Sequence, residues 1–142
     1  MARRRTHPDG LMRIALLGSY GIACGVASYL ADLARGFRDL GHEIAIFSER
    51  VLTGATDDPR DLPAPTRCWL RPKLDPEEVA NEVRAWKPDV VSIEHEFGIW
   101  PDDDRFVALA HGLQDSVTPH VIVTLHTVPR RWSHRVFFNS LL

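Results

Sequence analysis

The sequence predicts an α/β fold built on a doubly wound parallel sheet, and three observations support this prediction. Five short apolar segments have the character of buried strands, and they alternate with segments of helical periodicity. A glycine-rich loop joins the first strand to the first helix. The chain has 142 residues, of which 44% are hydrophobic and 25% charged, which is the size and composition of one globular domain. We therefore expect a single Rossmann-like domain.

The first half of the chain predicts a strand, a helix and a second strand. Arg13–Leu17 is an apolar run that suits a buried strand. Apolar residues then recur at helical spacing over 26–40, and Gly41 is placed to end that helix. Glu43–Phe47 predicts the second strand. Several prolines and a glycine make 51–66 a long loop.

The second half continues the alternation. A short strand is expected at Arg67–Leu70, followed by a helix over Asp75–Trp86 with an aspartate cap, a proline at its first position and two glutamates in its first turn. The remaining elements are expected to be a strand, a helix and a strand, at Val90–Ile93, Phe106–Leu113 and Val121–Leu125.

Basic residues gather at both ends of the chain. Residues 1–11 contain consecutive arginines, and residues 129–142 contain arginines and no acidic residue. We expect 1–11 to be a disordered basic extension and 12–128 to form the domain. Residues 129–142 are expected to be a basic and apolar tail, for which a final helix is left open.

Composition and charge favour some cellular locations and binding partners of the protein over others. The chain has no run of 18 apolar residues and no uninterrupted signal-peptide core. Cys24 and Cys68 are too few for a disulfide framework, which favours reduced thiols in a cytoplasmic protein. The formal net charge of −2 argues against a nucleic-acid partner. The basic ends leave open a weak peripheral contact with the inner membrane face.

The loop at 18–25 (GSYGIACG) leads from a strand into a helix N-terminus, where free N–H groups favour an anion such as phosphate. Its glycine spacing differs from the dinucleotide fingerprint and from the P-loop. Glu49 nevertheless follows the second strand, where dinucleotide-binding folds place a ribose-binding acid. Glycines that serve only strand–helix packing are the structural alternative.

Residues 94–100 (EHEFGIW) follow the fourth strand. If strand geometry persists there, Glu94 and Glu96 face one way and His95 the other. Ionisable groups at the end of a buried strand are costly unless they are solvated, paired or functional. One histidine and two carboxylates could bind a metal, but no second ligand pair lies nearby in the sequence, so we expect none.

His126 ends the fifth strand, where its imidazole would meet a ligand in the cleft. A histidine in that place could orient or protonate a reacting hydroxyl or phosphate. A hydrogen-bonded structural histidine is the alternative. The sequence has no Ser-His-Asp spacing and no nucleophile elbow.

Several segments together resemble family-4 glycosyltransferases. Over about residues 12–128, the chain is similar to the N-terminal, acceptor-side domain of that family. The similarity rests on these stretches, in order: MRIALL at 12–17, CGVA at 24–27, LGHEI at 40–44, PDVV at 88–91, HEFGIW at 95–100 and VTLHT at 123–127.

The resemblance implies a retaining transferase of the GT-B kind, of which this chain would be the N-terminal half. It implies a nucleotide-sugar, such as a UDP- or GDP-sugar, as co-substrate and a carbohydrate or other hydroxyl acceptor, with no metal or cofactor. It also implies roles for individual residues. His126 would have a catalytic role. Gly21, Cys24 and Gly25 would belong to a loop at the donor diphosphate. The acceptor side of the cleft would be lined by His95, Glu96, Trp100 and Thr127.

The sequence departs from the family pattern in three places. Cys24 replaces the first glycine of the usual pair, and Pro101 stands where a glycine is common. Residues 129–142 differ from the usual continuation, and no second domain follows them in this sequence. We therefore expect a truncated enzyme that is inactive alone.

Two other functions remain open on the sequence. The glycine loop and Glu49 are compatible with a Rossmann domain that binds a nicotinamide dinucleotide. A non-catalytic module, which pairs with itself or another chain through its open cleft or apolar tail, is the third possibility.

Overall fold

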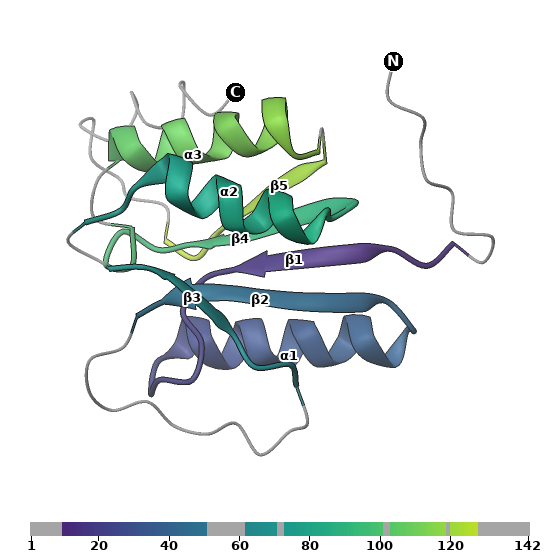
Figure 1. The fold of residues 1–142 in the computed structure, drawn as a ribbon. Helices are drawn as coiled ribbons and strands as arrows, with labels where there is room; N and C mark the ends of the chain where they lie inside the picture. The colour runs from purple at the N-terminus through teal and green to yellow at the C-terminus, as the bar shows by residue number, and fades with distance from the viewer. Residues whose placement is uncertain (1–9, 51–61, 71–72, 101–102, 119, 128–142) are drawn as a thin grey trace.

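Five parallel strands form the sheet of the computed structural model, which describes residues 10–50, 62–70, 73–100, 103–118 and 120–127 (Figure 1). Within these residues the strand order is β3-β2-β1-β4-β5. The strands are β1 (Arg13–Leu17), β2 (Glu43–Glu49), β3 (Thr66–Trp69), β4 (Val90–His95) and β5 (Val121–Leu125).

Helices cover both faces of the sheet (Figure 1). Helix α1 (Gly25–Asp39) lies on one face, and α2 (Pro76–Trp86) and α3 (Asp103–Ser116) lie side by side on the other. The chain leaves β1 for β2 through α1 and later returns to the other side of β1 through α2 and β4. This reversal confirms the predicted doubly wound sheet and places its switch point between β1 and β4.

The helix ends follow the predicted local chemistry. Asp75 caps α2, because its Oδ1 accepts from the backbone N–H groups of Glu77 and Glu78 at 3.0 and 3.2 Å. Gly41 follows α1 with a φ of +90°, a left-handed conformation that glycine adopts at little cost. Both helix ends were predicted from these residue types.

Two strands run further than the apolar pattern predicted. Strand β2 extends to Glu49 and β4 extends to His95, although both extensions carry ionisable residues. The fold buries these side chains: Glu49 is 3% exposed, and Glu94 and His95 are fully buried. The remaining differences are small, with β3 one residue earlier and α3 three residues longer at each end.

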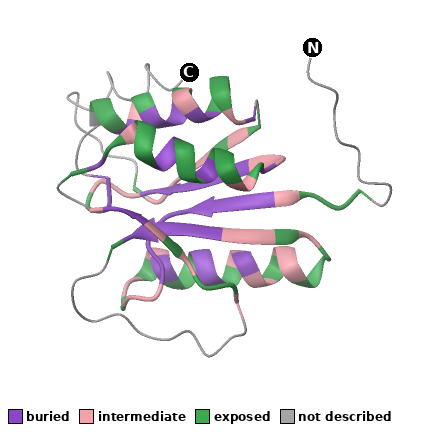
Figure 2. Ribbon diagram, in the orientation of Figure 1, coloured by how far each residue is buried: buried purple, intermediate pink, exposed green. Residues whose placement is uncertain are grey.

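The core has a cluster on each face of the sheet (Figure 2). On the α1 face, Leu30, Ala31 and Ala34 pack against Ile14 and Leu16 of β1. The larger cluster lies under α2 and α3. There the rings of Trp69 and Trp100 stack with centroids 4.6 Å apart, and both residues are almost fully buried. Because Trp100 belongs to the loop that follows β4, this larger cluster anchors that loop.

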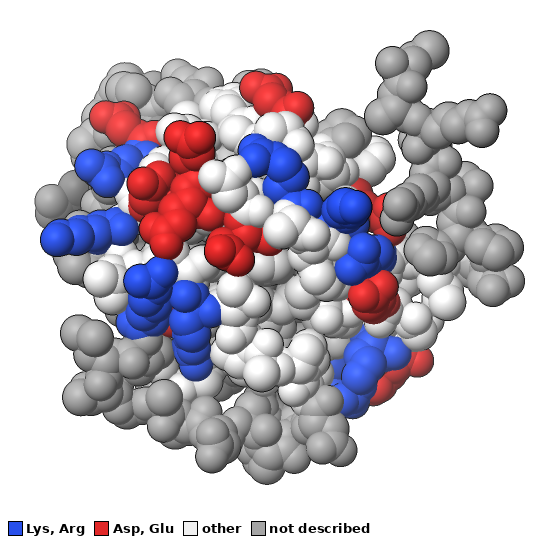
Figure 3. Space-filling model, viewed as in Figure 1, with Lys and Arg blue, Asp and Glu red and all other residues white. Residues whose placement is uncertain are grey.

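The visible surface over α2 is acidic, with basic side chains beside it (Figure 3). One exposed ion pair bridges the two charges, where Arg50 Nη2 lies 3.0 Å from Glu78 Oε1. Such pairs contribute at most about 1 kcal/mol to stability. We therefore interpret this surface as a solvated helix face.

The predicted basic extension at 1–11 lies outside the described residues except for its last two positions, and the tail at 129–142 lies outside them entirely. Most of the predicted loop, 51–61, is also outside them. None of the helices in the described part of the chain combines the length and the apolar character needed to cross a bilayer.

Candidate functional site

Three segments that the sequence singled out meet at the carboxyl edge of the sheet. The loop at 18–25 follows β1, residues 96–100 follow β4, and residues 126–127 follow β5. These three strands are neighbours in the sheet. In open α/β sheets, ligands bind outside this edge at the switch point, which here lies between β1 and β4.

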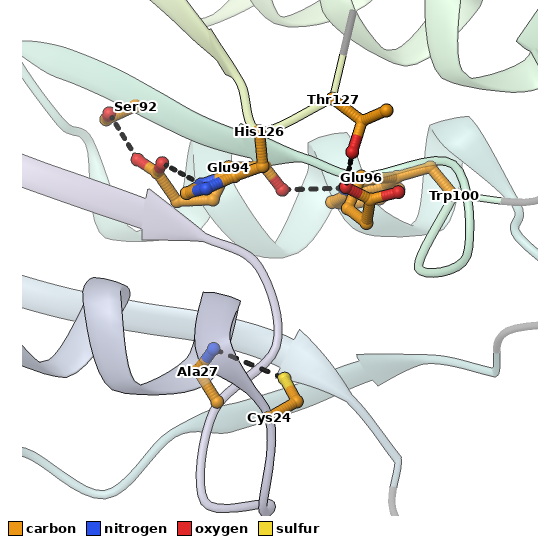
Figure 4. A network of polar contacts seen from close by, with 8 residues as sticks. All are labelled: Cys24, Ala27, Ser92, Glu94, Glu96, Trp100, His126 and Thr127. Atoms are coloured by element: carbon orange, nitrogen blue, oxygen red, sulfur yellow. Dashed lines mark hydrogen bonds and ion pairs between the residues drawn. The ribbon is translucent and has the colours of Figure 1, made fainter. Parts of the chain in front are cut away.

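A buried carboxylate and a histidine form the centre of this edge (Figure 4). His126 Nε2 lies 3.0 Å from Glu94 Oε2. The Glu94 side chain is fully buried, whereas 19% of the His126 side chain is exposed. The other Glu94 oxygen, Oε1, accepts a hydrogen bond from Ser92 Oγ at 3.2 Å. Both oxygens of the buried group are thus partnered, as burial demands.

Helix α1 contributes to the same centre. The ring of Tyr29 meets the His126 ring edge-on, with centroids 4.9 Å apart. Gly18 makes the approach of α1 possible, because a Cβ there would lie 2.9 Å from Leu30 Cδ1 and 3.1 Å from Glu94 Cβ. A larger residue at position 18 would therefore force Leu30 and Glu94 to shift.

The start of α1 is open. Gly21 has a φ of +67°, which turns the loop, and Cys24 is the N-cap, with its Sγ accepting from Ala27 N at 3.3 Å. Gly25 is the first residue of α1, and a Cβ added there would meet no atom within 4 Å. The absence of a side chain at Gly25 is therefore not required by packing against the chain itself.

His95 lies on the opposite face of β4 from Glu94, as the strand alternation predicts. Its ring meets those of Phe97 and Phe106 edge-on, with centroids 4.8 and 4.4 Å away. Burial lowers the pKa of His95 to about 4; the nearby Glu96 carboxylate opposes this shift and His126 adds to it. His95 is therefore a buried neutral histidine, and its predicted contact with an acceptor stays a prediction.

The other residues predicted for the acceptor side divide into two kinds. Trp100 is fully buried and donates from Nε1 to the Glu94 carbonyl at 3.0 Å, which ties the loop after β4 to the strand. Glu96 and Thr127 are more exposed, and Thr127 Oγ1 donates to Glu96 Oε2 at 2.5 Å. The structure thus brings Glu96 and Thr127 together beside His126.

Glu49, the predicted ribose acid of the dinucleotide alternative, is held inside the fold. It is 3% exposed, and its Oε1 accepts from Ser19 Oγ at 2.7 Å. Arg67 Nη1 donates to the carbonyls of Tyr20 and Glu49 and to Ser48 Oγ, at 2.8 to 3.0 Å. These contacts make Glu49 part of the support of the glycine loop.

Three contributors were not singled out by sequence reasoning. Ser92 stands two residues before Glu94, so the period of a strand places both on one face, and that spacing could have revealed it. Tyr29 falls within the apolar helical periodicity noted over 26–40, although it is 44% exposed. Arg67 gave no signal in the sequence, because its acceptors are mainly backbone carbonyls.

Among the residues that the structure describes, no three His, Cys, Asp or Glu side chains gather as metal ligands would. The expectation that the protein needs no metal stays a prediction.

Comparison with known proteins gives a family and a fold. Residues 23–142 match the family model of Glycosyltransferase Family 4. An alpha-glucosyltransferase solved with UDP and a 13-mer DNA containing a HMU base is similar, with a TM-score of 0.53, 18% identity and coverage of 80% of this chain and 29% of that one. An alpha-glucosyltransferase solved with UDP-glucose and DNA containing an abasic site has a TM-score of 0.52, 18% identity and the same coverages.

These likenesses show the Rossmann-like fold that the sequence predicted, and the chain spans less than a third of the length of those structures. No curated protein sequence matches the chain.

Proposed function

This chain belongs to glycosyltransferase family 4, and from that premise we propose that its sheet supplies the acceptor-side half of the catalytic cleft of a retaining glycosyltransferase. The enzyme would transfer a sugar from a nucleotide-sugar to a carbohydrate or another hydroxyl acceptor. The other wall of the cleft would come from a second, donor-binding domain, since the chain spans 29% of the solved alpha-glucosyltransferases that it resembles in fold.

One observation supports this proposal most directly. His126 directly follows β5 at the carboxyl edge of the sheet, is partnered by the buried Glu94, and contacts Tyr29 in the second turn of α1. A partly exposed histidine therefore lies next to a helix N-terminus at the edge where parallel sheets bind ligands. Position and chemistry agree with the proposed catalytic role of His126.

The start of α1 suits the diphosphate of a nucleotide-sugar. A helix N-terminus presents N–H groups and a positive dipole end, and α1 has no acidic residue in its first turn to oppose an anion. The open position at Gly25 lets a ligand approach the backbone. When the sugar leaves, negative charge grows on the diphosphate, and fixed N–H dipoles stabilise that charge without a metal.

The acceptor would lie beside Glu96 and Thr127. Their side chains are hydrogen-bonded to each other just beyond β4 and β5. Glu96 follows His95 in the chain, and Thr127 follows His126. A carboxylate and a hydroxyl are suitable partners for sugar hydroxyls. This assignment follows the family resemblance together with the exposure of the two residues.

Gly25→Ala tests the proposed donor contact, with Gly36→Ala as its matched control. Both glycines lie in α1, and a Cβ at either position meets no atom within 4 Å. Gly36→Ala is expected to stabilise the fold by about 0.5–1 kcal/mol, because alanine is favoured over glycine inside a helix. Gly25→Ala is expected to stabilise it by less, since Gly25 is the first residue of α1. Only Gly25→Ala is expected to weaken binding of UDP-glucose, by about tenfold or more, since the methyl group would block the diphosphate.

Chemical-shift titration of the 15N-labelled chain with UDP and UDP-glucose measures this binding. Shifts are expected at residues 21–25 and at His126, and they should be reduced in Gly25→Ala alone. Equal affinities of the two alanine variants would remove the diphosphate from Gly25. Shifts confined to residues far from the carboxyl edge of the sheet would contradict the proposed function itself.

A further inference from the structure

The His126 side chain is held from several sides. Its Nε2 faces Glu94 Oε2 at 3.0 Å, and the Tyr29 ring packs edge-on against it. Its backbone N–H donates to the His95 carbonyl at 3.0 Å, which continues the pairing of β5 with β4 past the last strand residue. The ring therefore has a fixed orientation, with Nε2 turned into the protein (Figure 4).

The partners of Glu94 indicate which atom carries the proton of the pair. The Ser92 hydroxyl donates to Oε1, and Nε2 of His126 stands at hydrogen-bond distance from Oε2. An ionised carboxylate only accepts hydrogen bonds, and a fully buried one is costly unless both oxygens receive donors. Nε2–H is the donor available to Oε2, so Nδ1 of a neutral ring keeps its lone pair.

We propose that Glu94 is a positioning residue that holds His126 as the neutral Nε2–H tautomer and so presents the Nδ1 lone pair as the hydrogen-bond acceptor for a substrate hydroxyl. Among the described residues, His126 Nδ1 makes no hydrogen bond, and part of the ring is exposed. A carboxylate that orients a histidine through one ring nitrogen fixes what the other nitrogen offers. Glu94 itself is too deeply buried to reach a ligand.

The identity of the hydroxyl rests on the proposed function, but the tautomer does not. Within a glycosyltransferase, the hydroxyl would belong to the sugar or to the acceptor. An Nδ1 acceptor at this place would orient that hydroxyl by accepting its proton in a hydrogen bond. Ser92 would act one step further away, by supplying the second donor to Glu94.

Long-range 1H–15N spectra of the labelled 142-residue chain test the inference at about pH 8, above the ordinary histidine range. His126→Gln identifies the His126 signals by their loss. The expected wild-type pattern has a protonated Nε2 and an unprotonated Nδ1. In Glu94→Gln, a neutral amide replaces the carboxylate, and the tautomer ratio should shift by about tenfold toward Nδ1–H, because charge-assisted hydrogen bonds are about twice as strong as neutral ones.

Glu49→Gln is the matched control, because Glu49 is also a buried strand-end carboxylate with a serine donor, whereas the carboxylate that faces His126 is that of Glu94. It should leave the His126 signals in the wild-type pattern. A wild-type ring protonated at Nδ1, alone or together with Nε2, would overturn the inference, and so would an unchanged ratio in Glu94→Gln.

The wild-type spectrum tests the tautomer even if Glu94→Gln fails to fold, because a ring protonated at Nδ1 would already overturn the inference. The test is also separate from that of the proposed function. A chain with the expected tautomer, in which UDP-glucose shifts only residues far from the carboxyl edge of the sheet, would contradict the function and leave the role of Glu94 in place.

Discussion

His95 shows how one residue can make the stability of the domain depend on pH. It is fully buried between aromatic rings, and burial lowers its pKa from 6.5 to about 4. Between pH 6.5 and about 4, His95 binds a proton in the unfolded chain but not in the folded chain. The free energy of unfolding therefore falls as the pH drops from 6.5 to 4, and the loss is complete once the folded histidine also protonates.

His95→Gln is expected to flatten this dependence. Between pH 7 and pH 5, the wild-type chain should lose about 2 kcal/mol that the variant does not lose, because each pH unit in the window corresponds to about 1.4 kcal/mol. Urea unfolding at the two pH values measures the difference, whatever the variant's absolute stability. His120→Gln is the control for the loss of an exposed histidine. Parallel slopes for wild type and His95→Gln would contradict the lowered pKa.

In the glycine loop at 18–25, residue types predicted the turn but not the contacts of each glycine. The sequence predicted a turn between β1 and α1, and the positive φ of Gly21 agrees with it. It could not tell that a side chain at Gly18 would press on Leu30 and Glu94, whereas one at Gly25 would face open space. Both facts depend on atoms that are distant in the sequence and become neighbours only through the fold.

The N-caps of α1 and α2 differ in strength because their acceptors differ. Asp75 is a charged oxygen acceptor that receives two backbone donors, and it also faces the positive end of the helix dipole. Cys24 offers one sulfur atom to one donor, and sulfur is a weak acceptor. The start of α1, at the candidate site, is therefore the less strongly capped end.

Alanine substitution at the two caps should separate them. Asp75→Ala is expected to lower the free energy of unfolding by about 1 kcal/mol, and Cys24→Ala by less than about half of that. Cys24→Ser should stabilise the chain relative to Cys24→Ala, because serine is a favoured cap with an oxygen acceptor. Urea midpoints of the three variants give the comparison. Equal losses at the two caps would show that the sulfur contact is as strong as the carboxylate contact.

The elements were predictable where local chemistry decides them. Capping residues and helical periodicity identified α1 and α2, because those signals act within a few residues. The extensions of β2 and β4 were missed, since an apolar pattern stops at the first polar residue. What keeps Glu49 and Glu94 in their strands is a set of donors from other segments, namely Ser19 for the first and His126 for the second.

The topology of the whole molecule explains why the candidate site was predictable as a place but not as a set of contacts. Alternating strands and helices predict a parallel sheet, and its carboxyl edge collects the loops after β1, β4 and β5. The pairing of His126 with Glu94 depends on the register of β5 against β4, where Glu94 faces Thr124 and His95 faces Leu125. No pattern within one segment fixes that register.

The isolated chain is expected to bind a nucleotide-sugar without turning it over. At its carboxyl edge, the described sheet offers His126 and the start of α1 as groups that could contact a substrate. Sugar transfer also needs a donor that is held in line with the acceptor. That positioning accounts for about 7–11 kcal/mol of a typical bimolecular barrier, and here it would depend on a second domain. Release of UDP from UDP-glucose, with and without mixed saccharides as acceptors, measures turnover, and an active two-domain family-4 enzyme is the positive control. UDP release by the wild-type chain that His126→Gln abolishes would place the complete catalytic machinery within these 142 residues.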